Sequence, residues 1–275
     1  MAFDGDWQLG LTDIGALRLQ QARRAWDARD PGRAMVEAEE LLDEEPDNLD
    51  ALLLVADAAL ELGDTAVARA AFGQALEIDN SIPTAWSGYA VASYELTDLP
   101  ACVDAARHAL AMDEGIAEAH FYLGLALDHQ GDEEQAAAEL GRATQLDPAS
   151  FPAIPRLDPV TAEHALARAL SLMAPPMRAW FDQVPIVFDR YPSIEQLRQE
   201  DLPLSPSSPA LYVGKPPTEG QDPTQSWPER FVVYVRNLER MAALGADVGL
   251  ILATALRGEA LDWFGLPDDE MPLRV

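Results

Sequence analysis

Three carboxylates near the end of the last predicted helix are the residues of this chain best placed to do chemistry. Glu259 and Asp262 lie within a mainly apolar stretch, residues 246–263, that we expect to be helical. Asp268 follows this stretch. Carboxylate oxygens can transfer protons or hold a hard cation. A weak oxygen-ligand cation site is one interpretation of this cluster. Solvated carboxylates near a helix end are the commoner explanation.

Other side chains that could take part in catalysis are scarce. His164 is the one histidine after residue 150, and an isolated histidine is more often solvated or packed than a ligand. Cys102 is the one cysteine of the chain, which excludes an internal disulfide and a multi-cysteine metal site. No nucleophile and base stand in a recognisable pair. We therefore expect no bound metal and no cofactor.

The elements that would position the carboxylates follow a change in composition after residue 150. Of the 21 prolines, 16 fall in the second part of the chain, so we interpret 151–159 as a linker. The pattern beyond it predicts a helix, short strands and a closing helix, which is typical of a small α+β domain over 160–275. These elements are expected at residues 160–173, 184–189, 211–213, 231–235 and 246–263.

This second part resembles the minimal zincin-like metallopeptidase family of bacteria. The resemblance is carried by residues 184–188, 211–214, 231–238 and 264–266. The family motif HExxHxxGxxD implies two zinc-binding histidines, a glutamate that activates the metal-bound water and a further aspartate ligand. When the motif is aligned on Gly265, Glu259 and Asp268 match, but Gly258 and Asp262 replace both histidines. The resemblance thus implies a degenerate motif without zinc and without catalytic residues, because unactivated water keeps its high pKa.

The first part of the chain is organised by an interval of 34 residues. Four copies follow one another without insertion, at 15–48, 49–82, 83–116 and 117–150, after a leader at 1–14. Positions 4, 7, 8 and 11 of each copy lie on one helical face, and small residues recur at positions 8 and 20, where two helices can approach closely. Those small residues are Ala22, Ala56, Ala90 and Gly124 at position 8, and Ala34, Ala68, Cys102 and Ala136 at position 20.

This pattern resembles the tetratricopeptide repeat, in which each copy forms two antiparallel helices and neighbouring copies share a core. The resemblance implies a mainly α protein, in which a four-repeat α-solenoid precedes the small α+β zincin-like domain. The fourth copy keeps the family pattern best, and the first copy has the character of a terminal repeat.

Positions 2, 5, 9 and 12 remain free once the packing positions are assigned, and the resemblance places them on a concave surface. The predicted partner-binding groove comprises Leu19, Arg23, Trp26, Asp50, Leu53, Asp57, Leu60, Ser87, Val91, Tyr94, Glu118, Phe121, Leu125 and Asp128. Apolar residues alternate with acids there, and the basic clamp that some relatives use for a carboxylate is absent. We expect a protein or peptide partner with apolar anchors and Lys or Arg between them. The alternative is that residues 151–175 of the chain cover the groove.

Charge narrows the range of partners. The net charge is −28 and the pI is about 4.2, which disfavours nucleic acid and anionic membranes as direct partners. Of the 47 acidic residues, 30 lie in the first 150. The acidity of the array favours a basic partner. The alternative explanation of this acidity is that it keeps the protein soluble. Neither a signal peptide nor a membrane span is recognisable, so a cytoplasmic location is expected.

These observations favour a non-catalytic interaction scaffold or adaptor, in which the repeats bind a partner segment and a pseudo-peptidase domain offers a second surface. A divergent metal-dependent hydrolase with a rearranged site is one alternative. An obligate subunit of a larger assembly is another.

Overall fold

The computed structural model describes residues 9–197, 205–218 and 226–265, with side chains from residue 15 onward. The chain divides into two compact units, Met1–Phe151 and Pro152–Val275, and each is described by itself. The first is helical, and the second combines helices with a three-stranded sheet. The predicted fold class, mainly α with a small α+β domain, is confirmed.

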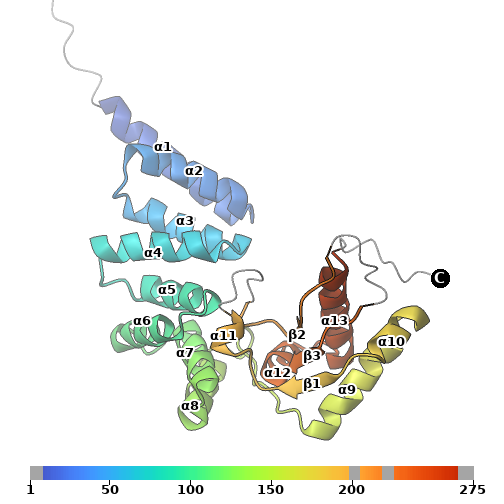
Figure 1. The fold of residues 1–275 in the computed structure, drawn as a ribbon. Helices are drawn as coiled ribbons and strands as arrows, with labels where there is room; N and C mark the ends of the chain where they lie inside the picture. Colours follow the sequence, from blue (N-terminus) through green and yellow to red (C-terminus); the bar gives the residue numbers. More distant parts are fainter. Residues whose placement is uncertain (1–8, 198–204, 219–225, 266–275) are drawn as a thin grey trace, which may run out of the picture. The chain divides into compact units, whose positions relative to one another are not determined.

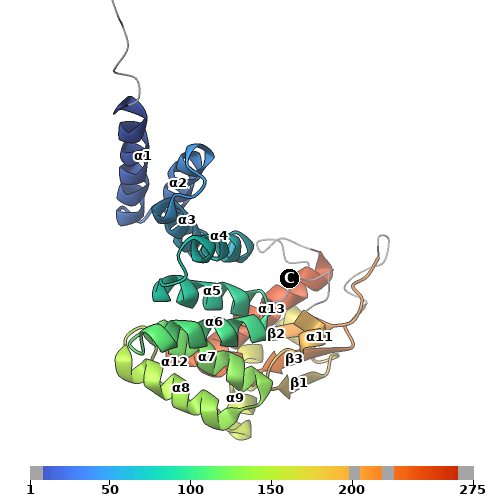
Figure 2. The same ribbon diagram turned by 90° about the vertical axis from the view of Figure 1, so that its left-hand side faces the viewer.

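The first unit is a row of helix pairs (Figure 1). Its helices are α1 (Leu9–Asp27), α2 (Pro31–Glu44), α3 (Leu49–Leu62), α4 (Thr65–Ile78), α5 (Pro83–Glu95), α6 (Leu99–Met112), α7 (Ala117–Gln130) and α8 (Glu133–Leu146). Each odd-numbered helix packs against the even-numbered helix that follows it, and successive odd-numbered helices also contact one another (Figure 2). The odd-numbered helices therefore share one face of the array.

Aspartates at the interval of 34 begin the even-numbered helices. Asp30, Asp64, Asp98 and Asp132 each accept a hydrogen bond from the backbone N–H three residues later. Such N-caps satisfy amides that have no partner within the helix, and each contributes about 1 kcal/mol. Some of the acidic residues of the array therefore serve as N-caps of its helices.

The helices of the fourth pair approach closely at Gly124, as the small residues at positions 8 and 20 predict. A Cβ built on Gly124 would lie 2.7 Å from Leu140 Cγ and 3.1 Å from the carbonyl oxygen of Ala136. Position 124 therefore has no room for a side chain. Cys102, at position 20 of the third repeat, is fully buried, and burial raises its pKa to about 12, in keeping with a packing role.

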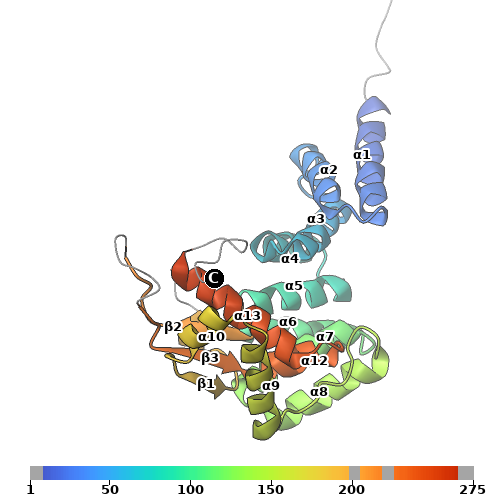
Figure 3. The same cartoon turned by 90° about the vertical axis from the view of Figure 1, so that its right-hand side faces the viewer.

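The second unit contains a mixed sheet and a core of large apolar side chains. Its elements are α9 (Pro159–Ser171), α10 (Pro175–Phe181), β1 (Ile186–Asp189), α11 (Ile194–Leu197), β2 (Ala210–Val213), β3 (Arg230–Tyr234), α12 (Val235–Ala243) and α13 (Val248–Phe264). The strand order is β1-β3-β2, with β1 parallel and β2 antiparallel to β3 (Figure 3). Three helices, α10, α11 and α12, were not predicted from the sequence.

The residues that flank α13, the last helix of the domain, explain where it begins and ends. Asp247 accepts a hydrogen bond from Leu250 N–H, which starts α13 two residues later than predicted. Gly265 ends it in the left-handed conformation, with φ of 65°. On its inner side, Leu252 and Leu256 join the core with Trp180 and Phe231.

Candidate functional site

Two surfaces are candidates for function, the predicted groove of the array and the degenerate motif of α13. The predicted groove residues all lie on α1, α3, α5 and α7, the helices that share one face. The structure distinguishes three groups among them. Arg23, Asp50 and Asp57 are exposed; Leu19, Trp26, Leu53, Leu60, Glu118 and Phe121 are half-buried; Ser87, Val91, Tyr94, Leu125 and Asp128 are buried.

The buried group corrects the prediction that the whole stripe is available to a partner. Tyr94 is 0 % exposed, and its ring lies edge-on to Tyr122 with centroids 5.6 Å apart. Its truncation would remove packing rather than a surface anchor. Phe121 stays half-buried, and its ring lies 4.8 Å from that of Phe151. The accessible part of the stripe consists mainly of residues from the first two repeats.

The charges of the groove are of two kinds, paired and unpaired. Arg23 Nη2 lies 2.9 Å from Asp50 Oδ1, so this acid already has a cation. Asp57 makes no ion pair within the described residues. Glu118 accepts a hydrogen bond of 2.8 Å from Ser87 Oγ, and no basic side chain pairs with it in the same residues.

Asp57 and Glu118 influence one another although they belong to α3 and α7. Desolvation by surrounding groups, with a further contribution from the charge of Glu118, raises the pKa of Asp57 to about 6. Asp57 nevertheless has an exposed side chain, so solvent screens part of this effect. A cation that lies between the two carboxylates would reduce the repulsion between their negative charges.

The second candidate surface is the degenerate motif on α13. Gly258, Glu259 and Asp262 lie on this helix, whereas Asp268 lies outside the described residues. A Cβ built on Gly258 meets nothing within 4 Å, so the position has room for a larger side chain. Asp262, one turn later, is exposed. His164 is exposed on α9, and no group of three His, Cys, Asp or Glu that could hold a metal occurs in the described part of the chain.

Glu259 is engaged by the sheet. Its Oε2 accepts a hydrogen bond of 2.9 Å from the backbone N–H of Tyr212 on β2. Desolvation by burial raises the pKa of Glu259 to about 7, with a smaller contribution from Asp262, while the Tyr212 hydrogen bond acts in the opposite direction. No local pattern predicts this contact, because it joins residues 47 apart in the chain.

The side chains present do not fit a zinc ion of the kind that the motif implies. Gly258 offers no ligand atom, and one oxygen of Glu259 is occupied by a backbone amide. Zinc sites need three or four nitrogen, sulfur or oxygen donors at close to tetrahedral angles, and α13 supplies no imidazole.

The fold and these surfaces define a helical-repeat protein with a small α+β second domain. Residues 25–90 and 117–150 match models described as tetratricopeptide repeat, and residues 181–274 match the model described as zincin-like metallopeptidase. The chain therefore contains tetratricopeptide repeats followed by a zincin-like metallopeptidase domain.

Solved structures resemble the chain over about half its length. The MamA protein is 19 % identical with a TM-score of 0.47, covering 50 % of this chain and 75 % of that one. MamA from Desulfovibrio magneticus RS-1 is 21 % identical with a TM-score of 0.46, covering 50 % and 77 %. YrrB, described as a TPR protein with an unusual peptide-binding site, is 17 % identical with a TM-score of 0.43, covering 48 % and 68 %.

No curated protein matches the chain. Among the described helices, none is both long and apolar enough to cross a membrane.

Proposed function

We propose that this protein is a non-catalytic interaction scaffold whose repeat array binds a segment of a partner protein. One observation carries the proposal: half-buried apolar side chains alternate with exposed charges along the face that the odd-numbered helices share. Leu19, Trp26, Leu53 and Leu60 pack with one side against the core of the array and leave the other side accessible. Apolar anchor positions between charges are typical of a surface that binds an amphipathic segment.

The charges favour a cationic partner segment. Asp50 is already paired with Arg23, whereas Asp57 and Glu118 have no cation within the described residues. A Lys or Arg of the partner that lies between these two carboxylates would relieve their repulsion. The expected ligand is therefore a helix or extended segment with apolar anchors and a basic residue between them.

A charge reversal with a matched control tests this function. Asp57→Lys changes the predicted face, and Asp104→Lys makes the same change at an exposed position of α6, outside that face. A partner recovered by affinity purification from the native host should associate more slowly with the first variant and normally with the second. Stopped-flow mixing and calorimetry measure both quantities. Equal effects of the two variants would place the binding site elsewhere.

We further propose that the zincin-like domain is a pseudo-peptidase that serves as a second interaction surface. Support comes from Gly258 and Asp262, which stand at the two histidine positions, and from the Glu259 oxygen engaged by Tyr212 N–H. The raised pKa of Glu259 is a property that general acids and bases also have, so a divergent hydrolase is the competing function. Elemental analysis separates the two. Stoichiometric metal together with peptide hydrolysis would contradict the pseudo-peptidase.

A further inference from the structure

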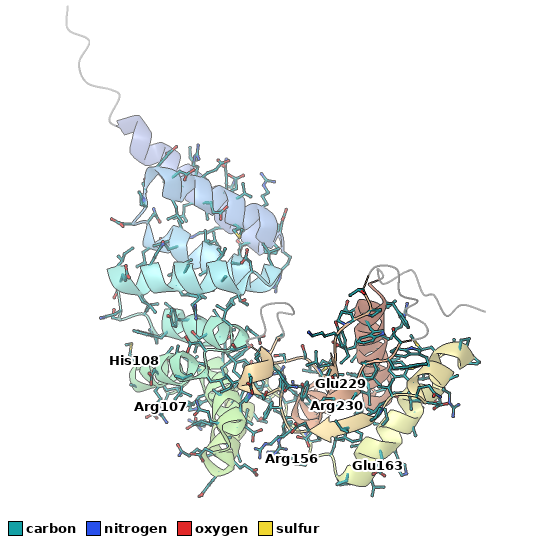
Figure 4. The ribbon with its side chains drawn as sticks, viewed as in Figure 1. Arg107, His108, Arg156, Glu163, Glu229 and Arg230 are labelled. Carbon is teal, nitrogen blue, oxygen red and sulfur yellow. The ribbon has the colours of Figure 1, made fainter. Side chains whose placement is uncertain are left out.

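A cavity with polar walls lies between α6 and α8, on the side of α7 that faces away from the predicted groove. Its volume is about 340 Å³, at the lower end of the range of small-molecule sites. The residues that line it are Arg107, Leu110, Ala111, Glu114, His120, Leu123, Leu127, Gln135, Glu139 and Arg142. They belong to the third and fourth repeats. Arg107 lies on α6 (Figure 4).

The cavity exists where the fourth repeat departs from its neighbours. Position 4 holds Leu52 in the second repeat and Trp86 in the third, but His120 in the fourth. Position 23 holds alanine in those two repeats and Glu139 in the fourth. A polar pair has thus replaced an apolar side chain and an alanine where the two helices of the repeat, α7 and α8, contact one another.

The histidine is held from both sides. Its Nδ1 lies 2.5 Å from Glu139 Oε2, and its Nε2 lies 3.1 Å from the backbone oxygen of Glu114. Glu139 Oε2 and the backbone oxygen of Glu114 both lie within hydrogen-bond distance of a ring nitrogen, so both nitrogens of His120 have a partner. His120 retains only 9 % of its exposure, so the residue is largely buried. These two contacts hold the ring in place at the floor of the cavity.

The two arginines of the cavity differ from most arginines of the array. Five of the eight make ion pairs with carboxylates in the described structure. Within the same residues Arg107 and Arg142 make none, although the array carries a large excess of acid. Both are exposed, and both line this cavity. Their guanidinium groups are available to an anion.

A charge count indicates the class of that anion. Arg107 and Arg142 contribute two positive charges, and Glu114 and Glu139, which line the same cavity, contribute two negative ones. Because the two guanidinium groups share the cavity with two carboxylates, a monoanion fits better than a phosphate monoester, which would bring nearly two negative charges into an acidic array. Leu110, Ala111, Leu123 and Leu127 supply an apolar wall.

We propose that this cavity binds a carboxylate attached to a short apolar body, with Arg107 and Arg142 as the groups that hold the carboxylate. The carboxylate can belong to a small molecule or to the C-terminus of a protein. Guanidinium groups bind the planar carboxylate with paired N–H donors, and the leucines cover the apolar body. The site is separate from the predicted groove and independent of the scaffold function.

Titration of the full chain with three probes of equal chain length tests the site. Hexanoate should bind saturably and shift the NMR signals of His120 and Leu123, hexanamide should not, and hexyl phosphate should bind more weakly than hexanoate. Arg107→Gln and Arg142→Gln should each weaken hexanoate binding about tenfold, as loss of a charged hydrogen bond does. Arg24→Gln is the matched control, because Arg24 is an exposed arginine without an ion pair in the described residues but lies on α1.

The source of the carboxylate is distinguished with a leucine-rich tripeptide that carries a free C-terminus. Binding as tight as that of hexanoate would assign the site to protein C-termini, and binding of hexanoate alone would assign it to a small molecule. The amidated tripeptide should not bind in either case. Equal binding of hexanoate and hexanamide, tighter binding of hexyl phosphate, or unchanged affinity in both cavity variants would overturn the proposal.

Discussion

The carboxyl group of Glu259 makes the stability of the second domain depend on pH. In the folded state its pKa is raised from 4.5 to about 7, chiefly because burial disfavours the ionised form. Between these values the folded chain retains a proton that the unfolded chain has lost. The folded state therefore binds more protons, and its free energy of unfolding falls as the pH rises through this window. Below the window both states are protonated and the effect vanishes.

Glu259→Gln removes the titrating charge and keeps a side-chain oxygen that can accept the Tyr212 N–H. One pKa unit corresponds to about 1.4 kcal/mol, so the raised pKa of Glu259 costs at most about 3 kcal/mol at high pH. We expect the variant to be more stable than the parent by up to about 3 kcal/mol near pH 8, and nearly equal to it near pH 4.

Hydrogen exchange in increasing guanidinium, followed by mass spectrometry of peptides from β2 and α13, reports this domain separately from the array. Glu163→Gln, at an exposed position of α9 (Figure 4), is the matched control and should not change the pH dependence. A variant at position 259 that loses the same stability at both pH values would refute the reasoning. Such a result would mean that the side chain of Glu259 stabilises the domain in a way that does not depend on its ionisation, for example through its contact with Tyr212.

Three further predictions concern packing, association and metal. Gly124→Ala should destabilise the array by about 1 to 3 kcal/mol, because its Cβ meets Leu140, whereas Gly141→Ala on α8, with open space around it, should stabilise by about 0.5 to 1 kcal/mol; thermal melts compare them. Asp57→Lys should slow association with a basic partner more at low salt than at high salt, measured by stopped flow. The unaltered chain should contain well under one equivalent of zinc, and Gly258→His with Asp262→His should raise zinc uptake in elemental analysis, because position 258 has room for a ring.

The helical half of the fold could be predicted because its signal is local and periodic. Small residues at fixed positions and helix-starting aspartates recur at an interval of 34, and α3, α5 and α7 begin at Leu49, Pro83 and Ala117. The second domain has no such repetition. Its strands were found from β-prone residues, but the short helices α10 to α12 were missed, since α10 begins at two prolines and α12 directly continues β3.

The candidate sites were predictable only where one element carries them. The stripe on the odd-numbered helices follows from helical periodicity, but the burial of Tyr94 and Leu125 depends on contacts that the period does not encode. The pair of His120 and Glu139 joins two helices of one repeat, and the interval of 34 does not show which residues of the two helices face one another. A polar residue at a packing position, with an acid at a facing position, is the signal that could have found it.

The acidic residues of the array have more than one role, and only those without a structural role are evidence about a binding partner. Asp30, Asp64, Asp98 and Asp132 begin helices through their side chains. Other aspartates, at the interval of 34, accept hydrogen bonds in the turns between repeats. The hydroxyl and then the backbone N–H of Ser81 lower the pKa of Asp79, and the backbone N–H of Ser150 is the main cause that lowers the pKa of Asp147.

Acids committed in this way cannot be counted as evidence for a basic partner, because the fold itself requires them. What remains on the predicted groove is a small set, in which Arg23 already pairs with Asp50. A preference for a cationic segment therefore depends on Asp57 and Glu118. The net charge of −28 is no evidence for that preference, because it would stay strongly negative if these two acids were replaced.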